Sequence, residues 1–139
     1  MNSPMLPGSV MKRRKFIVGT TTALVGANSQ ELAKPPRIRI AQIGLAHPHA
    51  IGKLKAVRSL PDTFDFVGVV EPDRSLRKRA KEVNFISLDQ LMNTKEIEAV
   101  TIETRVQDLV TTALPIVEAG KHIHLDKPAG PSLEPFKKL

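Results

Sequence analysis

One stretch of the chain has the residue types and spacing of a phosphate-binding turn. Residues 38–43 are rich in isoleucine, as in a buried parallel strand, and Gly44 follows them directly. A helix N-terminus carries free N–H groups and a positive partial charge, so a pyrophosphate can dock there when a glycine turn lets the backbone approach closely. Ala46 and His49 occupy the second and third glycine positions of the usual G-x-G-x-x-G fingerprint. We therefore predict the start of a dinucleotide-binding βαβ unit, with an ordinary βα turn as the alternative.

Two H-x-H pairs, His47 with His49 and His122 with His124, are further candidates for chemistry. Such pairs occur in metal sites, but a closed site needs three or four ligands and a supporting shell. The two pairs belong to the first and the fifth strands expected along the chain, which are not neighbours in a doubly wound sheet. We therefore predict no metal site, and we expect His124 to pack within its own strand.

Length and composition limit the possible functions. The 139 residues suffice for one domain with a core, but not for a cofactor domain and a full substrate domain. The absence of cysteine excludes disulfides, thiolate zinc sites and cysteine nucleophiles. The formal net charge is +7, but residues 12–15 form one basic run, and the remainder carries only about +3. Because aromatic side chains for base stacking are also lacking, nucleic-acid binding is the weakest hypothesis.

The first 27 residues have the order of features of an export signal. Arg13 and Arg14 precede Lys15, Phe16 and Ile17, in the form of a twin-arginine signal. The apolar stretch that follows is shorter than the roughly 20 residues of a membrane span, and it ends in small residues. We predict export to the periplasm or another extracytoplasmic compartment without a stable membrane span. A basic tail on a cytoplasmic protein is the alternative. Residues 28–36, which end in two prolines, are predicted to be a linker.

Strand and helix patterns alternate from residue 37 to residue 139. Strands are expected at residues 38–43, 64–70, 85–86, 99–103 and 122–126. Helices are expected after the glycine turn, over residues 75–83, after a capping box at Ser87 and Gln90, over residues 107–119 with Gly120 behind it, and after Ser132. This alternation predicts an α/β fold with a doubly wound parallel sheet.

Several of these stretches occur together in one known family. They are residues 44–49 at the glycine turn, residues 69–73 after the second strand, residues 87–91 before residues 98–102, and residues 118–128, which read E-A-G-K-H-I-H-L-D-K-P. The series resembles the N-terminal domain of the glucose–fructose oxidoreductase, inositol dehydrogenase and rhizopine-catabolism (Gfo/Idh/MocA) family over about residues 37–139. The resemblance implies a Rossmann-type domain that binds NAD or NADP. Some members of that family are exported by the twin-arginine route.

The resemblance also assigns cofactor-binding residues. Gly44, Ala46 and His49 fall at the three fingerprint positions, and Thr104 matches a threonine that follows the fourth strand. Glu71 falls where the family places a ribose-binding acid. Its carboxylate accepts hydrogen bonds from ribose hydroxyls and repels a 2′-phosphate, which favours NAD. Arg74 lies close enough in sequence to reverse that preference, so NADP remains open.

Lys127, within Asp126-Lys127-Pro128, matches the lysine of the family's Glu-Lys-Pro motif. The resemblance places this lysine near the nicotinamide and the reacting hydroxyl, so Lys127 is the candidate catalytic residue and, with Asp126, a cofactor contact. A positive charge at that point stabilises a developing alkoxide and assists proton transfer. The expected reaction is hydride transfer between the cofactor and a sugar or polyol.

The resemblance also implies a second α/β domain that forms the substrate pocket, and we expect none of the 139 residues to belong to it. We therefore expect residues 37–139 to be an NAD(P)-binding Rossmann domain truncated at its C-terminal end. Because half an active site cannot orient a substrate, whether this chain is itself an enzyme is left open. One hypothesis is a fragmentary sugar or polyol oxidoreductase that binds its substrate only when a second domain is supplied. The other is a non-catalytic dinucleotide-binding module.

Overall fold

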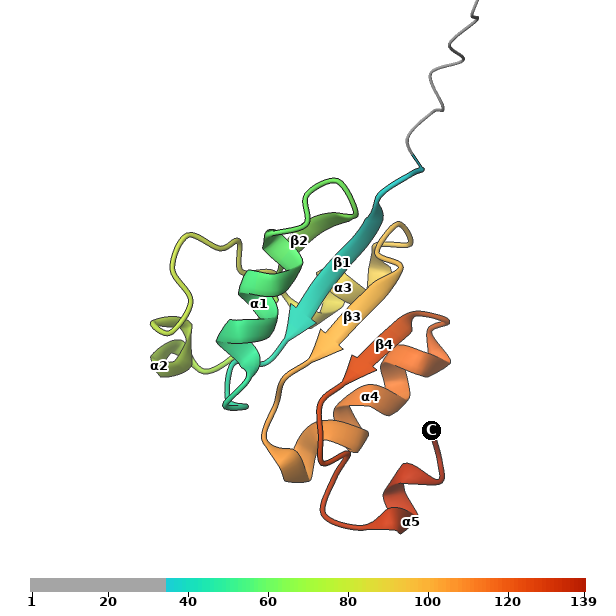
Figure 1. Cartoon of the computed structure of the whole chain (residues 1–139). Coiled ribbons are helices and arrows are strands. Elements are labelled where there is room, and N and C mark those ends of the chain that lie inside the picture. The colour runs from blue at the N-terminus through green and yellow to red at the C-terminus, as the bar shows by residue number, and fades with distance from the viewer. Residues whose placement is uncertain (1–34) are drawn as a thin grey trace, which may run out of the picture. The chain divides into compact units, whose positions relative to one another are not determined.

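The structure, a computed structural model, describes residues 35–139. The predicted export segment, residues 1–27, and nearly all of the predicted linker lie outside the described residues. Within the described part, strands and helices alternate along the chain and form one sheet covered on both faces (Figure 1).

The sheet contains four parallel strands in the order β2-β1-β3-β4. They are β1 (Ile38–Ile43), β2 (Phe64–Val70), β3 (Ala99–Ile102) and β4 (His122–Leu125). The carboxyl ends of parallel strands meet at one edge of a sheet, and this edge is where ligands bind in open α/β folds. Each strand here is followed directly by one residue of the candidate site: Gly44, Glu71, Glu103 and Asp126, respectively.

Helices pack on both faces, as the predicted doubly wound architecture requires. They are α1 (Ala50–Arg58), α2 (Arg74–Arg77), α3 (Leu88–Asn93), α4 (Leu109–Glu118), which follows a short 3₁₀ turn at Val106–Asp108, and α5 (Leu133–Phe136). In Figure 1, α1 lies in front of the sheet and α3 lies behind it. Among residues 35–139, no helix is both long enough and apolar enough to cross a membrane.

Two hydrophobic clusters hold these layers together, one on each face. Alternate residues of a strand point to opposite faces, and adjacent valines of β2 accordingly belong to different clusters. Val69 packs with residues of α1, and Val70 packs with residues of α3 and α4. The larger cluster contains Ala41, Ile43, Val70, Leu91, Ile97, Val100, Ile102, Leu109, Ala113 and Ile116. The smaller one contains Leu45, Ala50, Leu54, Val69 and Ala80.

The region between β2 and α3 differs from the prediction. The strand expected at residues 85–86 is reduced to a single parallel bridge between Phe85 and Val69, so the sheet has four strands instead of five. The helix expected over residues 75–83 ends at Arg77. The chain then turns, which lets Ala80 pack into the cluster beneath α1, and Glu82 adopts a positive φ of 55°. Tertiary packing has here replaced a local helical preference.

Helix ends follow the sequence signals more closely. Ser87 and Gln90 form the predicted capping box at the start of α3, each side chain bonding the other's backbone N–H. Gly120 follows α4 with a φ of +75°, as expected for a residue that ends a helix. Ser132 precedes α5 as predicted, but its hydroxyl makes no capping hydrogen bond.

Candidate functional site

The turn after β1 is built so that only glycine fits at its start. Gly44 has a φ of +88°, and a Cβ there would lie 2.8 Å from backbone atoms of Glu103 and Thr104. The buried amide of Gln42 holds both ends of the turn, because its Nε2 donates to the carbonyl oxygens of Gly44 (3.0 Å) and Ala50 (3.2 Å). The backbone of β1 and the start of α1 are thereby fixed against the end of β3.

Helix α1 begins at this turn. The N–H of its first residue, Ala50, donates to the backbone oxygen of His47 (3.1 Å), and no side chain caps the N–H groups that follow. His49 is the N-cap residue but makes no capping hydrogen bond. Its side chain is 55% exposed and so does not fill the contact between the helix and the strand. Ala50, fully buried, is the small residue at that contact instead. Free N–H groups at a helix N-terminus beside a glycine turn suit a pyrophosphate group.

Glu71 is buried at the end of β2 with its carboxylate held in one orientation. Its Oε2 accepts a hydrogen bond from the backbone N–H of Leu45 (2.8 Å), and its Oε1 accepts one from that of Asp73 (2.9 Å). An ionised carboxylate has about four lone-pair positions, so about two remain for further donors. A ribose diol presents two such hydroxyl donors.

A cavity of about 830 Å³ opens beside Glu71. Its size falls within the range of about 300–1,000 Å³ that is typical of ligand sites. Four of the predicted cofactor-binding residues line it, Gly44, Ala46, Glu71 and Thr104, together with apolar side chains that include Ile86 and Met92. The cavity thus joins the glycine turn to Glu71, the predicted ribose-binding acid.

The two arginines that line this cavity, Arg77 and Arg105, do not include Arg74, the one considered from the sequence. Arg77 lines the cavity, its Nε donates to the backbone oxygen of Glu71 (2.7 Å), and its guanidinium lies 5.0 Å from the ring centroid of Phe85. Arg74 is exposed at the start of α2 and is not among the residues that line the cavity. Arg77 and Arg105, rather than Arg74, are therefore the arginines placed beside a ligand in this cavity.

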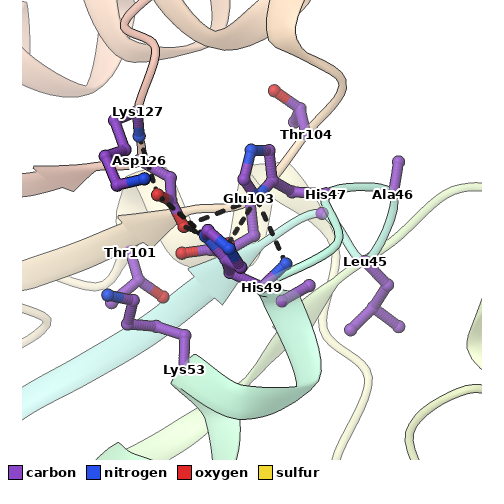
Figure 2. Close-up of polar contacts among 12 residues, drawn as sticks. Leu45, Ala46, His47, His49, Lys53, Thr101, Glu103, Thr104, Asp126 and Lys127 are labelled. Carbon is purple, nitrogen blue, oxygen red and sulfur yellow. Dashed lines mark hydrogen bonds and ion pairs between the residues drawn. The ribbon is translucent and has the colours of Figure 1, made fainter.

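The other predicted site residues belong to a second group at the same edge of the sheet, shown in Figure 2. Nδ1 of His49 lies 3.3 and 3.2 Å from the two carboxylate oxygens of Asp126. The backbone N–H of Lys127 donates to Oδ1 of Asp126 (2.7 Å), and the Lys127 side chain is exposed. Nδ1 of His47 lies 3.4 Å from Oδ2 of the same carboxylate.

Glu103 completes this group as a fully buried carboxylate. Its Oε2 lies 3.6 Å from Nδ1 of His47, and neither of its oxygens accepts a hydrogen bond from any described residue. Burial raises the pKa of Glu103 to about 7, the charge of Asp126 adds to the shift, and the ammonium of Lys53 opposes it. Burial acts against ionisation of Asp126 too, but the N–H of Lys127 and the imidazoles of His49 and His47 outweigh it and lower the pKa of Asp126 to about 2.

His47 and Glu103 belong to this group although the sequence analysis assigned them no role there. The signal that could have identified Glu103 is its position, since it follows a buried parallel strand directly and such residues gather at one edge of the sheet. His124 was expected to pack within its strand, but it is exposed and its Nε2 lies 3.1 Å from Nζ of Lys53. The two H-x-H pairs do not meet, and Asp126 contacts the first pair instead.

A parallel α/β sheet that carries a glycine turn, a buried acidic residue after its second strand and a cavity at its carboxyl edge is typical of a dinucleotide-binding domain. The chain matches the family model described as "Oxidoreductase family, NAD-binding Rossmann fold" (GFO_IDH_MocA) over residues 38–139. The chain therefore belongs to this family, which confirms the resemblance read from its motifs. No curated protein sequence matches the chain.

Solved structures share the fold. An oxidoreductase from Erwinia carotovora atroseptica is 28% identical, with a TM-score of 0.65 over 73% of this chain and 31% of that one. The WlbA dehydrogenase from Bordetella pertussis, solved with NADH and UDP-GlcNAcA, is 17% identical, with a TM-score of 0.65 over 76% of this chain and 32% of that one. The myo-inositol 2-dehydrogenase from Lactobacillus plantarum is 18% identical, with a TM-score of 0.62 over 74% and 32%. The chain spans about a third of the length of each of these structures.

Proposed function

We propose that this chain binds NAD, with a ribose diol on Glu71, and serves as the nucleotide-binding part of an oxidoreductase that acts on sugar or polyol hydroxyls. The observation that carries the proposal is the Glu71 carboxylate, which two backbone N–H groups hold at the wall of a cavity beside the glycine turn. The Bordetella dehydrogenase, which was solved with a sugar nucleotide, and the Lactobacillus inositol dehydrogenase support the substrate class.

The residues present fit a dinucleotide. The close approach at Gly44 leaves room for phosphate oxygens where a side chain would clash, and the uncapped start of α1 supplies N–H donors. The free lone pairs of Glu71 suit ribose hydroxyls and disfavour a 2′-phosphate, so the proposal is NAD rather than NADP. Bound NAD would supply the hydride acceptor for oxidation of a secondary alcohol.

Lys127 is the residue of this chain proposed to act on the substrate. It follows β4 at the edge of the sheet where the other site residues lie, and its side chain is exposed rather than engaged in the core. An ammonium group at that point stabilises the negative charge that develops on a hydroxyl oxygen as its proton leaves. Orientation of the substrate requires contacts on its other side as well. The alternative function is therefore a dinucleotide-binding module without catalysis.

Isothermal titration of the full chain with NADH and with NADPH tests the cofactor proposal. We expect NADH to bind more tightly than NADPH. Glu71→Gln should weaken NADH binding roughly tenfold, because hydrogen bonds to a charged group are lost, and it should reduce the preference over NADPH. Glu96→Gln, which changes an exposed carboxylate before β3, is the matched control and should leave both affinities unchanged.

The titration separates the alternatives. Equal weakening of both cofactors in Glu71→Gln would indicate a structural effect and would contradict the proposed role in cofactor choice. Absence of binding by either cofactor would show that the proposal is wrong. If NADH binds and the chain still shows no oxidation of any sugar or polyol when combined with a second domain from a relative, the non-catalytic module is the better description.

A further inference from the structure

We propose that His47, His49 and Asp126 form a binding site for one divalent transition-metal ion of the zinc class, with Glu103 as the buried carboxylate beside it. The site is distinct from the cavity next to Glu71, because none of these four residues lines that cavity. One candidate ligand atom from each of the first three residues lies within 4.8 Å of the other two. Figure 2 shows the side chains converging at the carboxyl ends of β1, β3 and β4.

The two distances from Asp126 match the edges of a coordination tetrahedron, and the ligand atoms of the two histidines lie within 4.8 Å of each other. Zinc binds imidazole nitrogen and carboxylate oxygen at about 2.0–2.2 Å, so two ligand atoms of a tetrahedral site lie roughly 3.3–3.5 Å apart. Oδ2 of Asp126 lies 3.4 Å from Nδ1 of His47 and 3.2 Å from Nδ1 of His49. Oδ1 of Asp126 already accepts the N–H of Lys127, which orients the carboxylate and leaves Oδ2 shared between the two rings.

Two buried carboxyl groups flank Nδ1 of His47 at 3.4 and 3.6 Å, an arrangement in which a cation would be stabilised. Glu103 is fully buried, its oxygens accept no hydrogen bond from a described residue, and Oε2 faces His47 Nδ1 at 3.6 Å. The backbone N–H of His49 lies 3.3 Å from the same Nδ1 atom, and in the tautomer of His47 that is protonated at Nε2 this nitrogen offers a lone pair to a metal ion. In that tautomer the lone pair faces both carboxyl groups, and a bound cation would relieve the repulsion between them. One divalent ion would balance the charge of both carboxylates. It would also take the place of the His49 N–H at Nδ1 of His47.

The exposure of the site and the chemistry of its ligand atoms indicate which ions could bind there. His47 and Asp126 are nearly buried, but the His49 side chain is 55% exposed, so an ion can enter from solvent and still be held by buried ligands. Two imidazoles with carboxylates suit zinc and its transition-metal neighbours, whereas calcium and magnesium prefer all-oxygen sites. The competing explanation is that protons alone hold the two histidines against Asp126.

Metal titration of the full chain distinguishes the two explanations, and it needs no nucleotide. Zinc should bind with one-to-one stoichiometry, and cobalt in its place should give the intense visible absorption of a tetrahedral site. Asp126→Asn and His49→Ala should each weaken zinc binding at least about 100-fold. Loss of a group that only supports a metal ligand weakens binding up to about 100-fold, and loss of the ligand itself should cost no less. Glu103→Gln should weaken it about 10- to 100-fold, because the ion then loses a compensating charge.

The second histidine pair provides the matched control. His122 and His124 are exposed, and neither is among the residues whose ligand atoms come together, so His122→Ala and His124→Ala should leave the affinity for zinc and the cobalt spectrum unchanged. Circular dichroism of every variant checks that it folds, and His49→Ala changes only an exposed side chain. No saturable binding by the wild type, or binding that weakens only when His122 or His124 is replaced, would overturn the proposal. Failure of NADH to bind would leave it intact.

Discussion

Oε2 of Glu103 lies 3.6 Å from Nδ1 of His47, and both side chains are at most 5% exposed. The two residues are far apart in sequence and meet because each follows the end of a parallel strand, His47 after β1 and Glu103 after β3. The carboxyl group of Glu103 is therefore removed from water and faces the carboxylate of Asp126 as well. Its protonation is consequently coupled to folding.

In the metal-free chain, the free energy of unfolding should fall as the pH rises from about 4.5 to about 7. Over this interval the folded chain keeps a proton on Glu103 that the unfolded chain has lost, since burial raises its pKa from 4.5 to about 7. The shift corresponds to an effect of roughly 3 kcal/mol. Asp126 acts in the opposite direction below its ordinary pKa of 3.8, so its stabilisation is lost as the pH falls towards about 2.

Urea unfolding with a chelator at pH 4.5, 6 and 8 measures this effect. Glu103→Gln removes the titrating group, so the decline between pH 4.5 and 7 should largely disappear, whereas Glu96→Gln should retain it. A decline of equal size in Glu103→Gln would assign the pH dependence to other groups.

Replacement of Gly44 by alanine should destabilise the fold by roughly 2–4 kcal/mol. Alanine would have to adopt a left-handed backbone conformation, and its Cβ would clash with neighbouring backbone atoms. The added atom would lie 2.8 Å from Glu103 and Thr104. Gly52→Ala is the matched control: Gly52 lies within α1, and nothing is within 4 Å of its added Cβ. Alanine should stabilise that helix by about 0.5–1 kcal/mol. Thermal and urea unfolding of the two variants should therefore shift in opposite directions.

The sequence was sufficient to predict the strands that carry the site, because their signals are local and strong. Residues 38–43 and 64–70 read as buried strands and are strands with those bounds. The doubly wound class followed from alternation alone. The family's motifs also placed Glu71 and Gly44 correctly at the carboxyl edge of the sheet, where the cavity lies.

The contacts between Asp126 and the first histidine pair could not be read from local patterns. The sequence analysis dismissed a shared site because β1 and β4 are not neighbours, and β3 does separate them. The histidines, however, lie in the turn beyond β1, and this turn bends across the end of β3, where the N–H of His47 donates to the backbone oxygen of Glu103 (3.0 Å). Strand order governs distances within a sheet, but turns at its edge can span a strand.

Lys121→Met should destabilise the chain by about 1–3 kcal/mol, the typical effect of leaving buried polar groups without partners. Lys121 is buried, and its Nζ donates to the carbonyl oxygens of Thr94 and Ile97, both at 2.9 Å. This lysine of the E-A-G-K-H motif therefore joins the segment before β3 to the segment before β4. Lys95→Met, at an exposed position nearby, should change stability by less than about 0.5 kcal/mol. Similar urea midpoints for the two variants would contradict the structural role of Lys121.

Export by the twin-arginine route is a separate prediction, because it depends on residues 1–27. A fusion of residues 1–36 to a reporter that folds in the cytoplasm should appear in the periplasm of a bacterium with the twin-arginine channel. Arg13→Lys with Arg14→Lys should abolish this export although the charge is kept, because such signals are addresses read by a receptor. Lys12→Arg, which also keeps the charge, should have no effect. If the double lysine variant is exported as well as the wild type, or if export persists in a strain without the channel, the segment is not a twin-arginine signal. A reporter that stays in the cytoplasm in every case would favour the basic tail.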